Sequence, residues 1–241
     1  MSLKRTVTYP IVRKKARYSK VPLKYGRARI YRSINNRNHQ FSRTTECILS
    51  LNPSKGLGGN AGVKDLAFVF MFSSVNMYSH GVSTAYYDLP GYNEIAVLFD
   101  QYRIDKVDME IYWTKNSSAA VAVTPVPMLH IANDYNDAIT IFTNNTISEY
   151  ANCRTIQLNT AGFNANGCIK HSCKPKQANM IFNQGISTAY SERTGFVDCT
   201  YGNVSHYGTK ILYDSNGVTD DIDIGSLVIR FKYFITARNV R

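Results

Sequence analysis

The sequence contains no run of 18 or more apolar residues, and its N-terminus has no uninterrupted apolar core of signal-peptide length. The first absence argues against a membrane-spanning helix, and the second gives no indication of secretion. We therefore expect a protein that acts inside a cell without inserting into a membrane. Its 241 residues and 44% hydrophobic content suffice for one large folded domain and a tail.

Cysteine is scarce. The five cysteines are odd in number and never occur as Cys-x-x-Cys, which argues against a disulfide framework and a zinc knuckle. His171 and Cys173 would share one face of a strand, but two ligands do not close a metal site. We expect no metal here and assign both residues structural roles.

Catalytic motifs are missing as well. The five histidines are scattered, and the sequence has no nucleophile elbow, HExxH motif or phosphate-binding loop. The glycine-rich stretch 56–61 fits a dinucleotide-binding fingerprint in spacing only, because a strand rather than a helix is expected after it. We therefore expect no enzyme and no cofactor.

Acidic residues are absent from the first 43 positions, the first one being Glu46. The same segment holds 13 Lys or Arg, whereas the rest of the chain holds the other 15 bases and all 17 acids. A basic segment on a near-neutral body is expected of a protein that binds a polyanion with one part and builds a structure with the other. We divide the chain into a nucleic-acid-binding arm, residues 1–43, and a folded domain, residues 44–241.

Tyrosines are interleaved with the basic residues of the arm. Each ring can stack on an unpaired base while neighbouring cations meet phosphates, a combination suited to single strands. Arg13, Lys14, Lys15 and Arg17 also form a cluster typical of a nuclear import signal, which implies contact with the import machinery. The expected nucleic-acid-binding residues are Lys4, Arg5, Tyr9, Arg13, Lys14, Lys15, Arg17, Tyr18, Lys20, Lys24, Tyr25, Arg27, Arg29, Tyr31, Arg32 and Arg37.

From Gln40 onward apolar and polar residues alternate with a period of two, which indicates half-buried strands. Asn93 is a suitable N-cap for a short helix over 93–102, and Thr146 to Glu149 form a capping box for another short helix. Eight strands with long connections predict an all-β, antiparallel jelly-roll sandwich. The expected strands are B (40–51), C (64–75), D (103–114), E (126–133), F (168–174), G (195–200), H (205–213) and I (225–237).

Three of these strands supply most of the expected core. Strand C is apolar on its second face too, where Ala67, Val69 and Met71 need cover from a loop or a neighbouring subunit. The connections at about 76–92 and 134–167 are richer in apolar and aromatic residues than a solvated surface requires. The expected core residues are Phe68, Phe70, Phe72, Trp113, Ile229 and Phe231. The expected subunit-interface residues are Tyr86, Tyr87, Tyr92, Phe142 and Tyr150.

The chain resembles the capsid proteins of circoviruses and related circular single-stranded DNA viruses. The segments that carry the likeness are the basic arm, residues 99–113 (FDQYRIDKVDMEIYW), 150–154 (YANCR), 174–176 (KPK) and 202–208 (GNVSHYG), followed by a last strand with Arg230 and Lys232. The resemblance implies sheets ordered BIDG and CHEF, assembly into an icosahedral shell of about 60 copies, and packaging of single-stranded DNA in the host nucleus. The virion is then the final location, and the host receptor is unknown.

The BIDG order would make strands D and I neighbours. Lys106, Asp108 and Glu110 on D would then face Arg230 and Lys232 on I, and opposite charges could neutralise one another across the sheet. We expect such a body surface to leave little charge for nucleic acid.

Two other classes of protein stay open. A non-capsid viral nucleic-acid carrier, such as a movement or nuclear shuttle protein, would share the basic arm. A cellular jelly-roll binding module, such as a lectin, would usually be secreted and would not need the arm. Uniform spherical particles would favour the coat protein, and a nucleic-acid-bound monomer would favour the carrier.

Overall fold

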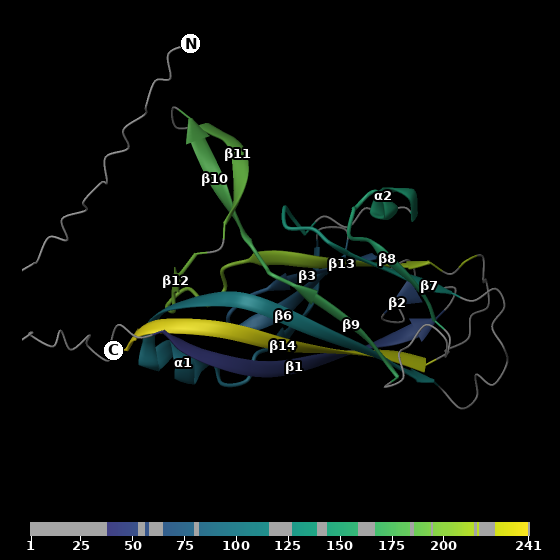
Figure 1. The fold of residues 1–241 in the computed structure, drawn as a ribbon, viewed down its shortest axis with the longest axis horizontal. Helices are drawn as coiled ribbons and strands as arrows, with labels where there is room; N and C mark the ends of the chain where they lie inside the picture. The colour runs from purple at the N-terminus through teal and green to yellow at the C-terminus, as the bar shows by residue number, and fades with distance from the viewer. Residues whose placement is uncertain are drawn as a thin grey trace, which may run out of the picture. The chain divides into compact units, whose positions relative to one another are not determined.

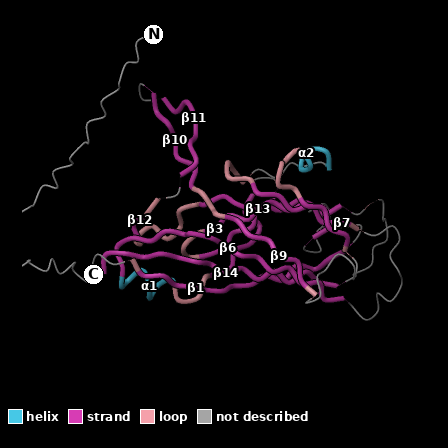
Figure 2. The backbone as a smooth tube through the Cα atoms, in the orientation of Figure 1, coloured by secondary structure: helices cyan, strands magenta, loops and turns pink. Residues whose placement is uncertain are grey.

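The structure is a computed structural model, which describes residues 38–52, 56–57, 65–79, 82–115, 127–138, 144–158, 167–183, 186–193, 195–214, 216 and 225–240. These residues form fourteen strands and two short helices (Figure 2). The strands are β1 (His39–Asn52), β2 (Gly56–Leu57), β3 (Asp65–Phe70), β4 (Ser74–Ser79), β5 (Val82–Asp88), β6 (Phe99–Lys115), β7 (Met128–Asn133), β8 (Arg154–Gln157), β9 (Cys168–Cys173), β10 (Gln177–Asn183), β11 (Ile186–Arg193), β12 (Val197–Asp198), β13 (His206–Asp214) and β14 (Gly225–Val240). The helices are α1 (Tyr92–Leu98) and α2 (Asn144–Ser148).

Long antiparallel strands build the first sheet and lie side by side in Figure 1. Its order is β12-β6-β14-β1-β2, and β9 also pairs with β6. Along β14, buried residues alternate with more exposed ones from Leu227 to Tyr233. Because successive side chains of a strand point to opposite faces, this alternation places one face of the sheet against the core and the other outward.

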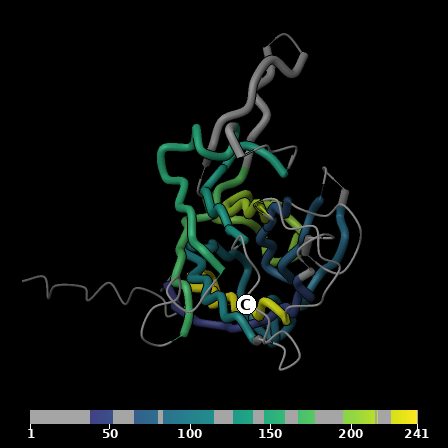
Figure 3. The backbone as a smooth tube through the Cα atoms, turned by 90° about the vertical axis from the view of Figure 1, so that its right-hand side faces the viewer, coloured from purple at the N-terminus to yellow at the C-terminus, as the bar shows by residue number. Residues whose placement is uncertain are grey.

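The second sheet has the order β5-β4-β3-β13-β7-β8 and is antiparallel throughout. Figure 3 views the sandwich from its end, with β14 and β1 at the bottom and β13 above them. With β1, β14, β6 and β9 as strands B, I, D and G, the first sheet follows the order BIDG. With β3, β13, β7 and β8 as strands C, H, E and F, the second sheet follows the order CHEF. The jelly-roll fold is therefore confirmed, while β10 and β11 form a separate two-stranded sheet.

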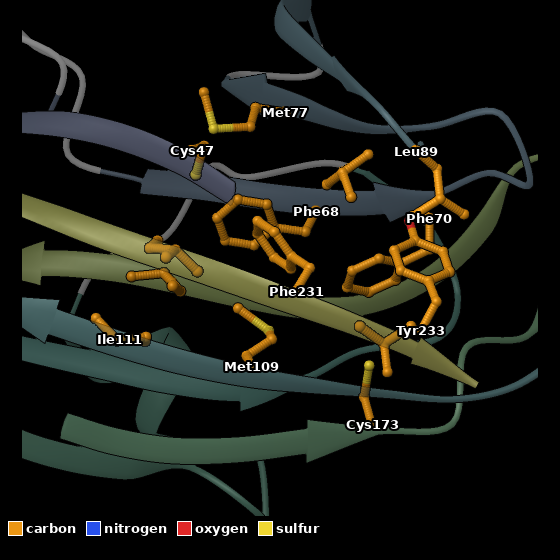
Figure 4. Close-up of a cluster of buried hydrophobic side chains, with 14 of the residues drawn as sticks. Cys47, Phe68, Phe70, Met77, Leu89, Met109, Ile111, Cys173, Phe231 and Tyr233 are labelled. Atoms are coloured by element: carbon orange, nitrogen blue, oxygen red, sulfur yellow. The ribbon is translucent and has the colours of Figure 1, made fainter. Parts of the chain in front are cut away.

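The core lies between the two sheets and is rich in aromatic side chains (Figure 4). Phe68 and Phe70 of β3 meet Phe231 and Tyr233 of β14, with ring centroids 5.1 Å apart for Phe68 and Phe231 and 5.9 Å apart for Phe70 and Tyr233. The Tyr233 hydroxyl donates to the carbonyl of Ser74 at 3.2 Å, which satisfies its one polar atom inside the core. Five of the six expected core residues are buried, and Trp113 is partly buried against the same cluster.

Two strand assignments made from the sequence are wrong. The segment expected as strand F forms β9, but β9 pairs with β6 and so occupies the G position of the first sheet. The F position is filled by β8, a four-residue strand inside the expected 134–167 loop, which pairs with β7. The segment expected as strand G contributes only β12, which pairs with β6 at Tyr102 and Gln101. Alternation marks a strand, whereas its partner depends on contacts distant in sequence.

The expected 76–92 loop is also wrong, because β4 and β5 form a hairpin there that extends the second sheet beyond β3. The first helix is shorter than expected and ends at Leu98, since Phe99 adopts an extended conformation and is buried as the first residue of β6. Its N-cap is Gly91 rather than Asn93, and Gly91 adopts a left-handed conformation with φ of 74°. These features come from tertiary packing that overrides local periodicity.

The second face of β3 is covered within this chain. Ala67, Val69 and Met71 are 2%, 1% and 9% exposed. Near this outer face α2 forms a small second cluster in which Ile147 packs with Ala132 and Leu212. A neighbouring subunit is therefore not needed to shield β3 from water.

Candidate nucleic-acid and assembly surfaces

All sixteen expected nucleic-acid-binding residues, and with them the nuclear import cluster, lie outside the described residues. The structure does show where the arm joins the sandwich. His39 pairs with Ala237 of β14, and the rings of His39 and Phe41 lie 5.1 and 5.4 Å from the ring of Phe99. Arg43, assigned to the arm by its charge, lies within β1 opposite Tyr233. β1, which follows the arm in the sequence, therefore begins at the end of the first sheet where β14 finishes.

A row of alternating charges crosses the outer face of that sheet. Glu46 of β1 is opposite Arg230 of β14, Arg230 is opposite Glu110 of β6, and Glu110 is opposite Lys170 of β9. The nitrogen–oxygen distances along the row are 3.6, 4.0 and 3.6 Å. We call these four residues the charged row. It confirms the expected opposition of strands D and I and extends it to both outer strands.

Neutralisation across this face continues beside the row. Lys106 pairs with Asp108 at 2.7 Å on the same strand, although the register places Lys232 opposite Asp108. The Tyr112 hydroxyl donates to Glu110 at 2.8 Å, and this hydrogen bond, with help from Lys170 and Arg230, lowers the pKa of Glu110. Because these side chains are partly exposed, each pair contributes little stability, roughly 0.2–1 kcal/mol.

The expected interface residues occupy different environments. Tyr86 of β5 is 69% exposed, whereas Tyr87 is partly buried against the core and burial raises the pKa of its hydroxyl. Tyr92 is partly buried at the start of α1. Phe142 lies outside the described residues. Of the four that are described, Tyr86 presents the most side chain to a partner.

Tyr150 belongs to a buried ion-pair network that was not predicted from the sequence. Lys210 of β13 is 2% exposed, and its Nζ donates to Asp134 at 2.6 Å and to Asp137 at 2.8 Å. The Tyr150 hydroxyl and the backbone N–H of Asn136 also donate to Asp134, at 2.8 and 2.9 Å. The network ties the segments before and after α2 to the outer face of the second sheet.

Electrostatics explains how this network tolerates burial. Burial by itself would raise the pKa of Asp134, but the hydrogen bonds from Lys210, Asn136 and Tyr150 outweigh it and lower the pKa. Removing one partner from such a pair leaves a charge with neither water nor a counter-ion. Lys210 sits where alternation predicts a solvated residue, so no sequence signal revealed its burial.

Apolar side chains are exposed around α1. Val97 and Leu98 are 70% and 54% exposed, and Tyr201 is 61% exposed. A groove of about 530 Å³ lies between α1 and the turn after β12, lined by Tyr92, Val97, Thr200 and Gly202 among others. The groove brings the expected interface residue Tyr92 together with exposed apolar groups that the sequence analysis did not single out.

A second groove, of about 600 Å³, lies along β9 and is lined by charged and polar side chains. His171 is buried beside it, and its Nε2 shares a 2.8 Å hydrogen bond with Asn133. Cys173 is 3% exposed and faces the core. No cluster of three or more potential metal ligands occurs among the described residues.

None of the helices in the described part of the chain is both long and apolar enough to cross a membrane.

The sheet order and the basic segment that joins the sandwich at β1 define a jelly-roll coat protein. Residues 7–241 match the family described as circovirus capsid protein, and the chain belongs to that family. It is thus a capsid protein of the circovirus type and a component of the virion, with a fold that is structural rather than catalytic. No curated protein matches the chain.

Solved structures resemble this chain in fold. A 60-mer crystal structure of the BFDV capsid protein is 15% identical, with a TM-score of 0.52, over 85% of this chain and 95% of that one. A decameric BFDV capsid protein is also 15% identical, with a TM-score of 0.47, over 84% and 99%. The Cocksfoot mottle virus structure is 8% identical, with a TM-score of 0.40, over 84% and 97%.

Proposed function

We propose that this protein assembles into a small icosahedral shell of about 60 copies and packages single-stranded DNA through its basic arm. The observation that carries the proposal is the division of charge: 13 bases and no acid lie in the first 43 residues, while the rest of the chain has two more acids than bases. The charged row supports it, because opposite charges on this face of the body pair with one another and leave little charge for DNA.

The proposal includes a stage in the host nucleus. Arg13, Lys14, Lys15 and Arg17 would bind the import machinery before assembly, and the arm would then bind DNA. Assembly is supported by the 60-mer crystal structure of the BFDV capsid protein, since both chains share a fold. Tyr86, Tyr87, Tyr92, Phe142 and Tyr150 are the proposed interface residues.

Removal of the arm tests the packaging role. The register of β1 and β14 determines how many residues can be deleted. His39 to Arg43 pair with Ala237 to Tyr233, so deleting residues 1–43 would shorten β1, whereas deleting residues 1–37 leaves it intact. Particles formed by the chain lacking residues 1–37 should be empty, while full-length particles should contain nucleic acid that DNase degrades and RNase does not.

The salt dependence of binding gives a second measurement. Each phosphate contact contributes about 0.7 to the slope of log affinity against log salt for a single strand, so the truncated chain should lose most of a steep slope. Alanine in place of Tyr9, Tyr18, Tyr25 and Tyr31 should weaken binding but keep the slope, because stacking releases no counter-ions. Truncated particles that package as much DNA as full-length ones would overturn the proposed role of the arm.

A further inference from the structure

The outer face of the first sheet is not uniform. Its middle carries the balanced charged row, but the end where β1 begins carries two aromatic rings, each accompanied by two cations. Phe196 precedes β12, and Phe234 lies on β14. We call this group the cation–aromatic cluster, and its members are Arg103, Lys106, Phe196, Lys232, Phe234 and Arg238.

Both guanidinium groups of the cluster lie over one ring. The Cζ atom of Arg238 is 3.9 Å from the centroid of Phe196, and that of Arg103 is 4.8 Å from it. Each is also held by a hydrogen bond, Arg238 to the side chain of Gln101 at 2.7 Å and Arg103 to Asp105 at 2.6 Å. Two planar cations are thus fixed in place around Phe196.

A register shift between β14 and β6, next to Phe234, brings the side chains of the cluster close together. Lys106 is opposite Phe234 and Ile104 is opposite Ile235, so Asp105 is the extra residue on β6. Its carboxylate accepts from Arg103 and from the hydroxyl of Thr236. The bulge allows Asp105 and Lys106, which are consecutive, to serve the same outer face.

The two ammonium groups share the second ring. Lys106 and Lys232 lie 5.6 and 5.4 Å from the centroid of Phe234, and Lys106 also pairs with Asp108. Three carboxylates stand on or beside this end of the face: Asp105 and Asp108 on β6, and Asp198, which binds the N–H of Thr200. Four cations against three carboxylates leave this end of the sheet with a net positive charge beside two rings, whereas the charged row balances two cations with two acids.

This combination suits single-stranded nucleic acid. Phosphates bind guanidinium and ammonium groups, and an unpaired base can stack on an aromatic ring or on the plane of a guanidinium. The location fits as well, because His39, with which β1 begins after the arm in the sequence, is opposite Ala237, next to Arg238.

We propose that the cation–aromatic cluster is a second single-stranded DNA contact, on the folded body, that continues the path of the arm. It rests on the proposed function, because it assumes a protein that packages DNA. It also revises the expectation that the body leaves little charge for the genome: the middle of the face is neutral, and one end binds DNA.

Matched double variants in the full-length chain test this contact. Lys232→Gln with Arg238→Gln removes two cations from the cluster, and Arg230→Gln with Lys170→Gln removes two from the charged row on the same face. With oligothymidylate as the probe, the cluster variant should lose about 1.4 from the salt slope and bind roughly tenfold more weakly at low salt, whereas the control keeps the parent slope. Phe196→Leu should weaken binding a few-fold with no change of slope.

The outcomes separate this contact from the arm. Equal losses in the two double variants would mean that net charge alone matters and would overturn the proposal. A cluster variant that binds oligothymidylate normally but fails to form particles would make the face a subunit contact, which also overturns it. Normal DNA binding and assembly by the cluster variant, with loss of binding on arm removal, would reject the cluster and retain the arm. Thermal unfolding of each variant checks that the sandwich is intact.

Discussion

Lys210 of β13 and Asp134, which follows β7, form a 2.6 Å ion pair on the outer face of the second sheet, with 3% and 5% of their side chains exposed. This pair holds the segment around α2 in place, because Tyr150 donates to the same carboxylate. Part of the outer face of the second sheet is thereby buried beneath this segment.

Breaking this pair should strongly destabilise the protein. Lys210→Met leaves Asp134 buried without its main partner, and we expect a loss of about 3–5 kcal/mol in the free energy of unfolding. Lys210→Met combined with Asp134→Leu should recover much of that loss, because no uncompensated charge stays buried. Urea unfolding of the parent, Lys210→Met, Asp134→Leu and the double variant measures the coupling between the two residues. A stability loss in the double variant equal to the sum of the two single losses would contradict the prediction.

Gly208 should be intolerant of a side chain. A Cβ there would lie 2.8 Å from the Phe70 ring and 3.0 Å from the sulfur of Cys173, both in the core. Gly208→Ala should therefore cost about 1–3 kcal/mol of stability. Gly195→Ala is the matched control, because nothing lies within 4 Å of its Cβ position. Similar melting temperatures for the two variants would show that the strand relaxes freely.

Two buried histidines should make stability depend on pH. Burial lowers the pKa of His206 and of His171 from 6.5 to about 4. Between these values the unfolded chain binds more protons than the folded one, so stability is complete above about pH 6.5 and falls as the pH drops toward 4. The His206 ring shares hydrogen bonds with Gln177 and the Val204 carbonyl, which fit a neutral imidazole.

Replacing one histidine isolates its contribution. His206→Gln should be less stable than the parent at neutral pH, because it disturbs a buried site, yet should lose less stability between pH 6.5 and 4. Chemical denaturation at several pH values gives both quantities. Parallel pH curves for the variant and the parent would show that His206 does not titrate in this range.

The charged row should tolerate exchange of its charges but not a run of like charges. Arg230→Glu would place three carboxylates in one row across β1, β14 and β6, and we expect a loss of up to about 1 kcal/mol that shrinks in high salt. Adding Glu46→Lys, Glu110→Arg and Lys170→Glu, which exchanges all four charges and restores their alternation, should recover most of it. Thermal unfolding at low and high salt is the measurement, and a loss independent of salt would point to packing instead.

Tyr86 should matter for assembly and not for folding, since 69% of it is exposed on the edge strand β5. Tyr86→Ser should leave the melting temperature of the subunit unchanged and reduce particle yield, because burial of an aromatic side chain contributes to interfaces. Tyr87→Ser is the contrasting variant. Because Tyr87 packs on the core, its replacement should lower the melting temperature. Normal particle yield from Tyr86→Ser would remove this residue from the interface.

Much of the fold could be read from the sequence because alternation reports burial directly. Leu227, Ile229 and Phe231 alternate with more exposed residues along β14, and all three are buried in the core. The opposition of Arg230 and Glu110 followed once the sheet order was inferred from the family resemblance. The basic arm is likewise a property of composition, which needs no fold to be recognised.

Tertiary structure alone decided which strands pair and which polar groups are buried. β9 has the alternation of any half-buried strand, so nothing local could assign it to β6 rather than to β7. Lys210 reads as a solvated residue until the segments around α2 cover it. The cation–aromatic cluster joins residues from β6, β14 and the approach to β12, and it exists only because a bulge at Asp105 and the pairing of β12 bring them to one face. Such placements depend on distant contacts, whereas periodicity depends on neighbours.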